Sequence, residues 1–143
     1  MTQRHVIIEK KNVLVAGGAG FLGSHLCDEL VKTCKVICVD NFSTGSIENI
    51  NHLLQNQDFK FIKHDLTEPI DLEKFAELRP FKVAFQGVQE IYNLACPTSP
   101  KEFTKLPIET LLAYAVASRH LLDLAVQYEA KYLLTSSSAI YGE

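Results

Sequence analysis

The sequence has no long apolar run. No stretch of it approaches the roughly 18 consecutive apolar residues that a membrane-spanning helix needs. The first 12 residues are mostly polar and charged, and they lack the apolar centre of a secretion signal. We therefore expect a protein that is neither exported by that route nor embedded in a membrane.

Positive charge is not in excess either. The chain has 14 lysines and arginines against 17 aspartates and glutamates, which gives a formal net charge of -3, and the basic residues are scattered. A nucleic-acid or anionic-membrane surface requires clustered basic residues. We therefore expect no nucleic acid and no membrane among its partners.

Cysteine and histidine are present without the spacing of a metal site. No two of Cys27, Cys34, Cys38 and Cys96 are separated by two residues, as zinc sites and redox dithiols require. The five histidines show no ligand spacing. This pattern predicts no metal site, and it favours buried, reduced thiols in a cytoplasmic protein.

What the sequence does contain is an alternation of two periodicities. The 143 residues, 47% of them hydrophobic, are enough for one folded domain. Strands are predicted at residues 13–16, 36–39, 59–62, 90–95 and 132–135, and helices at 21–32, 46–54, 72–78 and 108–128. The order predicts an α/β fold of the Rossmann type, a doubly wound parallel sheet with helices on both faces. The chain ends just after the fifth strand, so we expect this fold to be incomplete at the C-terminus.

Apolar stripes predict which helical side chains are buried. In the first helix the stripe is formed by Leu22, Leu26, Leu30 and Val31. In the long helix the predicted buried positions are Leu111, Leu112, Leu121, Leu122, Leu124 and Ala125.

A glycine-rich turn, residues 17–23, connects the first strand to the first helix. Backbone N–H groups and the positive end of the helix dipole can hold a diphosphate there, and a side chain at Gly17 or Gly20 would obstruct it. Gly23 would allow close packing of the helix on the strand. Such a turn can also serve packing alone, but its place between strand and helix predicts dinucleotide binding.

Two carboxylates follow the next strands. Asp40 lies 20 residues beyond Gly20, where it can accept hydrogen bonds from the adenosine ribose and would repel a ribose phosphate. This favours NAD over NADP. Asp65 could bond the adenine amino group. The alternatives are a cap or turn residue for Asp40 and a solvated turn acid for Asp65.

Five segments together resemble a known family. They are residues 17–23, 40–45, 64–66, 94–100 and 136–142, and they occur in the order typical of extended short-chain dehydrogenases/reductases. The chain is most similar to UDP-glucuronate decarboxylases, with dTDP-glucose 4,6-dehydratases and UDP-galactose 4-epimerases as close relatives. The resemblance implies a bound NAD that oxidises a nucleotide sugar at C4 and later returns the hydride.

The resemblance also assigns residues. Cofactor contacts are implied at Gly17, Gly20, Phe21, Leu22, Asp40, Asn41, Ser43, Thr44, Gly45, Asp65, Leu66, Leu94 and Ala95. The catalytic serine of the family falls on Ser137, whose hydroxyl would bond the sugar hydroxyl being oxidised. The alternative for Ser137 is a strand-end serine bonded to the backbone.

The chain departs from the family at several points. It contains no Tyr-x-x-x-Lys, the family's base, and Tyr141 is not that tyrosine. Ala16 replaces a common threonine, Tyr114 a common asparagine, and the 72–89 segment is longer than usual. We therefore expect residues 1–143 to be an NAD-binding domain without its substrate-binding part, inactive alone. A nonenzymatic Rossmann module and a truncated normal enzyme remain the alternatives, and the choice among decarboxylation, dehydration and epimerisation stays open.

Family members commonly dimerise through two helices per subunit, and only one of these is present. An unpaired apolar helix face would then be exposed. We expect self-association, with a homodimer as one form, or marginal solubility.

Overall fold

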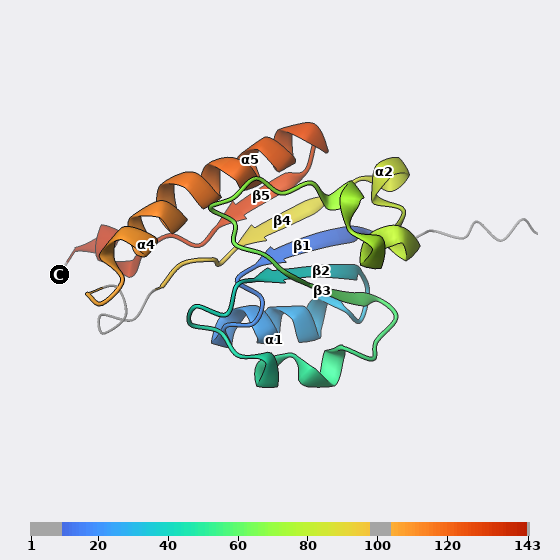
Figure 1. Cartoon of the computed structure of the whole chain (residues 1–143), viewed down its shortest axis with the longest axis horizontal. Coiled ribbons are helices and arrows are strands. Elements are labelled where there is room, and N and C mark those ends of the chain that lie inside the picture. Colours follow the sequence, from blue (N-terminus) through green and yellow to red (C-terminus); the bar gives the residue numbers. More distant parts are fainter. Residues whose placement is uncertain (1–9, 98–103, 143) are drawn as a thin grey trace, which may run out of the picture.

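The protein is built around a five-stranded parallel sheet. The computed structural model describes residues 10–97 and 104–142, so residues 98–100 of the 94–100 motif lie outside the described part. The strands are β1 Asn12–Ala16, β2 Lys35–Asp40, β3 Phe59–Lys63, β4 Glu90–Asn93 and β5 Lys131–Leu134. Their order is β3-β2-β1-β4-β5, with every pair parallel (Figure 1). This confirms the predicted doubly wound sheet.

Helices cover both faces of the sheet, as predicted. The helix α1 (Phe21–Leu30) packs on one face. On the other face lies a continuous helical run made of α4 (Pro107–Leu112), a π-helical segment (Ala113–Ala117) and α5 (Ser118–Gln127) (Figure 1). A proline in the first turn suits the start of this run, because its missing N–H would have had no helical partner there.

The core has two layers because successive strand residues point to opposite faces. Leu14 and Ile37 pack toward α5, whereas Val13, Val15 and Val36 pack toward α1. All five side chains are fully buried. A strand covered on both faces needs a continuous apolar run, and β1 and β2 have one.

The predicted helix at 46–54 is wrong in type. The segment forms two separate 3₁₀ turns, Ile47–Asn49 and Asn51–Leu53. Ile50 stands between them with φ -120°, which interrupts a helical backbone, and its side chain is fully buried. Ser46 caps the first of these turns, since its hydroxyl accepts a hydrogen bond from the Glu48 N–H.

The predicted helix at 72–78 is also wrong. The segment contains a 3₁₀ turn at Leu72–Lys74 and a second 3₁₀ helix at Ala76–Phe81, followed by the four-residue α2 (Val83–Gln86). Phe75 separates the first two with an extended backbone. Pro80 lies inside the second 3₁₀ helix and does not end it. The Asn12 side chain ties this segment to β1 by donating to the carbonyls of Phe81 and Gly87.

The burial pattern of the long helix needs a correction. Leu121, Leu124 and Ala125 are buried as predicted, but Leu111, Leu112 and Leu122 are exposed. For Leu111 and Leu112 the reason is the placement of α4, which extends past the carboxyl ends of the strands and so has no sheet beneath it (Figure 1). Leu122 lies in α5 on the face turned away from the sheet, next to the buried Leu121. Amphipathic spacing identified two apolar faces here, and only one of them contacts the sheet.

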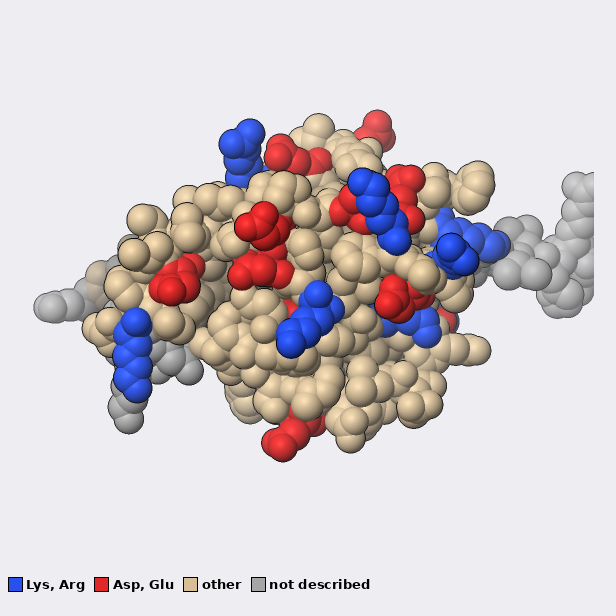
Figure 2. Space-filling view, viewed as in Figure 1, with Lys and Arg blue, Asp and Glu red and all other residues tan. Residues whose placement is uncertain are grey.

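The cysteines are free thiols. Cys27, Cys34 and Cys38 are buried and Cys96 is partly buried, and no disulfide joins the described cysteines. Within residues 10–97 and 104–142, no helix combines the length and the apolar character needed to cross a membrane. On the face shown in Figure 2, acidic and basic side chains are interspersed.

The contrast between two adjacent leucines is testable. Leu121→Ala should lower the free energy of unfolding by about 2–5 kcal/mol, because it opens a cavity in the core between α5 and the sheet. Leu122→Ala, at an exposed position, should change it by less than about 0.5 kcal/mol. Urea unfolding of the two variants at micromolar concentration measures both values. Equal losses would contradict the helix orientation described above.

Candidate functional site

The loops after β1, β2, β3 and β4 converge on one edge of the sheet. Backbone hydrogen bonds continue past the strand ends, from Gly17 N to the Val39 carbonyl, from Leu94 N to the Ala16 carbonyl and from His64 N to the Asp40 carbonyl. The predicted cofactor residues therefore lie side by side, although they come from four separate segments.

Three glycines of the turn have different structural reasons. Gly17 has φ +75°, and a side chain there would begin 2.7 Å from the Leu94 carbonyl carbon, so glycine lets the end of β4 approach. A Cβ on Gly23 would overlap the Gly17 carbonyl, which confirms that Gly23 permits close helix packing. At Gly20 the nearest atom is the Gly17 oxygen, 3.3 Å away.

The N-terminus of α1 is open. Its cap residue, Gly20, provides no side-chain hydrogen bond, and the first turn has no acidic residue. Phe21 and Leu22 are 76% and 66% exposed, so the predicted burial of Leu22 is wrong. The first N–H groups of a helix have no helical partners and carry partial positive charge. This end of α1 can therefore receive an anion.

Two thiols fill the space beneath the turn. A Cβ on Gly18 would overlap the Cys38 sulfur, and the Cys27 sulfur would be 3.3 Å from it. A hydrogen bond with Cys27, together with burial, raises the pKa of Cys38 far above its usual range. A buried, protonated thiol is a packing group and not a nucleophile.

Asp40 connects the glycine turn to the next loop. One carboxylate oxygen accepts from the Ala19 N–H at 2.9 Å, and the other accepts from the Phe42 N–H at 2.8 Å. The side chain is almost completely buried. Gly45 lies against the same turn, where a Cβ would stand 2.9 Å from the Ala19 carbonyl carbon. The cap-like role considered for Asp40 is thus present, and it fixes the geometry of the site.

The Ala19 carbonyl is held as well. It accepts from the Ser46 N–H at 3.0 Å and from the Asn49 side chain at 2.8 Å. The peptide groups on both sides of Ala19 are therefore held, one by Asp40 and the other by Ser46 and Asn49. The sequence did not reveal Asn49, because an asparagine in a polar loop carries no signal of its own.

A polar network joins the loop after β2 to the loop after β3. The Asn41 side-chain oxygen accepts from the Ser43 N–H and hydroxyl, and its amide donates to Asp65 at 3.2 Å. Asp65 also accepts from the Thr67 N–H and hydroxyl. Burial alone would raise the pKa of Asp65, but the bonds from Thr67 and Asn41 outweigh it and lower that pKa. Thr44 lies exposed in the loop after β2.

Asn93 fixes the loop after β4. Its side-chain NH2 group donates to the Ser118 hydroxyl and to the Tyr132 hydroxyl, and its side-chain oxygen accepts from the Ala95 N–H. The residue is 3% exposed. Leu94 and Ala95 are therefore set from α5 and β5 together. Sequence reasoning missed Asn93, although a polar residue at the end of an apolar strand was an available signal.

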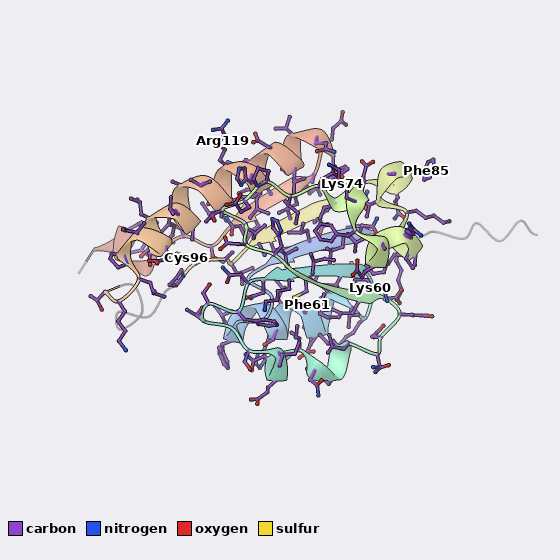
Figure 3. All side chains as sticks on the ribbon, in the orientation of Figure 1. Lys60, Phe61, Lys74, Phe85, Cys96 and Arg119 are labelled. Atoms are coloured by element: carbon purple, nitrogen blue, oxygen red, sulfur yellow. The ribbon has the colours of Figure 1, made fainter. Side chains whose placement is uncertain are left out.

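The helices on the α5 face contact two of the loops. Tyr114, in the π-helical segment, shares a hydrogen bond with the Cys96 thiol, and this bond together with burial raises the pKa of Tyr114. Figure 3 labels Cys96 beyond the end of β4. His120 bonds the Leu66 carbonyl at 2.9 Å. Tyr114, which stands where an asparagine was expected, therefore supports the loop after β4 at Cys96.

Ser137 lies farther along the same edge. It is exposed and follows β5, and its carbonyl accepts from the Ile140 N–H. The neighbouring Thr135 hydroxyl donates to the Asn93 carbonyl. Ser137 is thus separated from the glycine turn by β4. In the described ranges, no group of three or more His, Cys, Asp or Glu side chains could hold a metal ion.

Comparisons with known proteins agree with this geometry. Residues 14–143 match the family described as GDP-mannose 4,6 dehydratase. UDP-glucuronic acid decarboxylase 1 of Arabidopsis thaliana is 40% identical over 136 residues, which are 94% of this chain and 28% of that protein. The chain therefore spans less than a third of the length of this relative.

Solved structures share the fold. The UDP-N-acetylglucosamine 4-epimerase of Methanobrevibacter ruminantium, solved with UDP-N-acetylmuramic acid, superimposes with a TM-score of 0.75 at 33% identity, covering 95% of this chain and 41% of that one. A UDP-glucose-4-epimerase of Stenotrophomonas maltophila, solved with NAD and formylated UDP-arabinopyranose, gives 0.69 at 24% identity, covering 92% and 38%.

The fit between Gly18 and Cys38 can be tested by a double-mutant cycle. Gly18→Ala should lower the free energy of unfolding by about 1–3 kcal/mol, because the added methyl group overpacks the site against the Cys38 sulfur. Adding Cys38→Ala should recover about 1 kcal/mol of that loss. Urea unfolding of the two single variants and the double variant gives the coupling. Strict additivity would mean that the thiol does not define the turn.

Proposed function

Because this chain belongs to the GDP-mannose 4,6-dehydratase family, we propose that it supplies the NAD-binding part of an enzyme that modifies nucleotide sugars. The observation that carries the proposal is the Asp40 carboxylate, which ties the glycine turn to the loop after β2. That contact places an anion-accepting helix end beside a carboxylate suited to a ribose. The two features together match the anionic diphosphate and the neutral ribose of an adenosine diphosphate.

The proposed contacts follow the edge of the sheet. The diphosphate lies at the N-terminus of α1, against Gly17, Gly20, Phe21 and Leu22, where open N–H groups and absent side chains permit close approach. The residues proposed to surround adenosine are Asp40, Asn41, Ser43, Thr44, Gly45, Asp65 and Leu66. Leu94 and Ala95 face the remaining part of the cofactor.

Asp40 also gives the proposal its choice of cofactor. Each carboxylate oxygen accepts one backbone N–H, so each retains a lone pair for a ribose hydroxyl. A phosphate on that ribose would bring negative charge against the carboxylate. We therefore expect NAD to bind better than NADP.

The sugar chemistry that we propose is of the UDP-glucuronate decarboxylase type. When bound, NAD supplies a hydride acceptor for C4 of the sugar. Ser137 would donate or accept a hydrogen bond at the hydroxyl on that carbon, and so orient it. Since no Tyr-x-x-x-Lys occurs in these 143 residues, we propose that they bind the cofactor without converting the sugar. The cysteine pattern leads us to place the protein in the cytoplasm.

We further propose that the chain forms a homodimer through its long helix. Large apolar side chains are exposed on α4 and α5 at Ile108, Leu111, Leu112, Leu122 and Val126. Steps of three or four residues along the chain connect them, which places them on one side of the helix, where Arg119 interrupts the apolar stripe. An exposed apolar stripe of this length is typical of a helix that packs against another surface.

The NAD proposal predicts the effect of one charge. Asp40→Asn should weaken NAD binding at least tenfold by calorimetry, because the ribose loses a charged acceptor. In addition, the new side-chain NH2 group would face one of the two backbone N–H groups that Asp40 now binds, and two donors repel each other. The preference for NAD over NADP should shrink in the same variant. Asp58→Asn, at the opposite end of β3 and paired with Lys10, is the matched control and should leave affinity unchanged.

Absence of saturable binding by the unmodified chain at millimolar NAD would refute the proposal. The same samples, incubated with UDP-glucuronate, should return the sugar unchanged by chromatography. Conversion of the sugar would show that the chain carries a base of its own.

The dimer proposal predicts concentration-dependent association. Light scattering should show the mass of two chains at high concentration and of one chain for Leu111→Lys, because a charge in the apolar stripe opposes its burial. Phe85→Lys, at a still more exposed aromatic on α2 outside the stripe, should remain dimeric. A single monomeric species for the unmodified chain at millimolar concentration would exclude this interface.

A further inference from the structure

Phe42 has a backbone conformation that phenylalanine rarely adopts. Its φ is +62°, in the left-handed region. For a side chain with a Cβ this region is disfavoured by roughly tenfold in population, and asparagine or glycine usually occupies it. The residue stands between Asn41 and Ser43, in the loop proposed to receive adenosine. Strain that persists at such a place requires support from its surroundings.

Two residues of β3 provide this support. The Phe61 ring stacks on the Phe42 ring with centroids 5.0 Å apart and planes at 29°. The Lys63 ammonium lies over the same ring, 5.8 Å from its centroid. Figure 3 locates Phe61 on β3, in the part of the sheet next to β2. The Phe42 ring is thus held by an aromatic face and a cation, both favourable contacts for it.

The backbone of Phe42 is coupled to the glycine turn. Its N–H donates to one oxygen of Asp40, whose other oxygen accepts from Ala19. If Phe42 relaxed to negative φ, the peptide that carries this N–H would rotate, and the carboxylate would lose one of its two anchors. The ring contacts on β3 therefore reach the diphosphate end of the site through a single side chain.

We propose that Phe61 and Lys63 are positioning residues, which hold Phe42 in the left-handed conformation and so set the 41–45 loop before the cofactor arrives. The inference rests on the proposed NAD binding. A loop already ordered in its binding conformation loses less entropy when the ligand binds, so its affinity is higher. Phe61 acts in this way through Phe42 and Asp40, without contacting the cofactor.

Phe59 provides a matched control for ordinary packing. It lies on the same strand and the same face as Phe61, it is 1% exposed, and it belongs to the same core cluster. Among the described residues no ring contact joins it to Phe42. A purely structural role would make Phe59→Leu at least as harmful as Phe61→Leu, because the more buried ring leaves the larger cavity.

The experiment compares these two variants in the full 143-residue chain. Phe61→Leu should weaken NAD binding about tenfold by calorimetry and accelerate hydrogen exchange at the Phe42 amide in the unliganded protein. Phe59→Leu should lower the melting temperature at least as much while leaving both quantities unchanged. In the Phe61→Leu background, Phe42→Gly should restore most of the affinity, since glycine adopts positive φ without support.

Three results would be decisive against the inference. They are an unchanged Phe42 exchange rate in Phe61→Leu, equal losses of affinity in the Phe59 and Phe61 variants, and a double variant that binds more weakly still. If the unmodified chain binds no NAD, the proposed function fails. The exchange comparison then still decides whether Phe61 holds the loop, so the two failures are distinguishable.

Discussion

The site depends on one carboxylate that bridges two backbone N–H groups. Asp40 joins Ala19 of the glycine turn to Phe42 of the following loop, and it does so from an almost completely buried position. Both N–H groups lie in irregular backbone, which has no ladder to satisfy it. Without the carboxylate these N–H groups would need water as an acceptor, and the turn and the loop would no longer be fixed relative to each other. The same group is therefore a structural tie and the proposed ribose acceptor.

Asp40 can bridge the turn and the loop only because the backbone segments around it lie in close contact. Gly17 lets the end of β4 approach, Gly23 lets α1 approach, and Gly45 lets the second loop lie on Ala19. At each of these glycines a side chain would collide with a different neighbouring segment, so each glycine has its own structural role. A diphosphate needs the helix end to be open, and in this chain neither a capping side chain nor an acidic residue of the first turn occupies it.

The architecture was predictable because the spacing of apolar residues within each short segment indicates its secondary structure. Short apolar runs and helical stripes gave the five strands, α1 and the long helix, and the spacing from Gly20 gave Asp40. The 3₁₀ turns near Ile50 and Phe75 were not predictable, since single residues with extended or irregular backbone break them. Asn93 and Asn49 act through partners distant in sequence. A stripe shows which face of a helix is apolar, but not what covers it, which is why Leu111 was misplaced.

The two faces of the sheet support different parts of the proposed site. On the α1 face, Phe61 stacks on Phe42 and Asp40 accepts the Phe42 N–H, in the loop proposed to receive adenosine. On the α5 face, His120 holds the Leu66 carbonyl, while Ser118 reaches Ala95 through Asn93. One helix thus contacts loops that follow two strands on opposite sides of β1. Because the end of β4 lies against Gly17, a shift of α5 would move the loops after β3 and β4 together and would reach the glycine turn through Leu94.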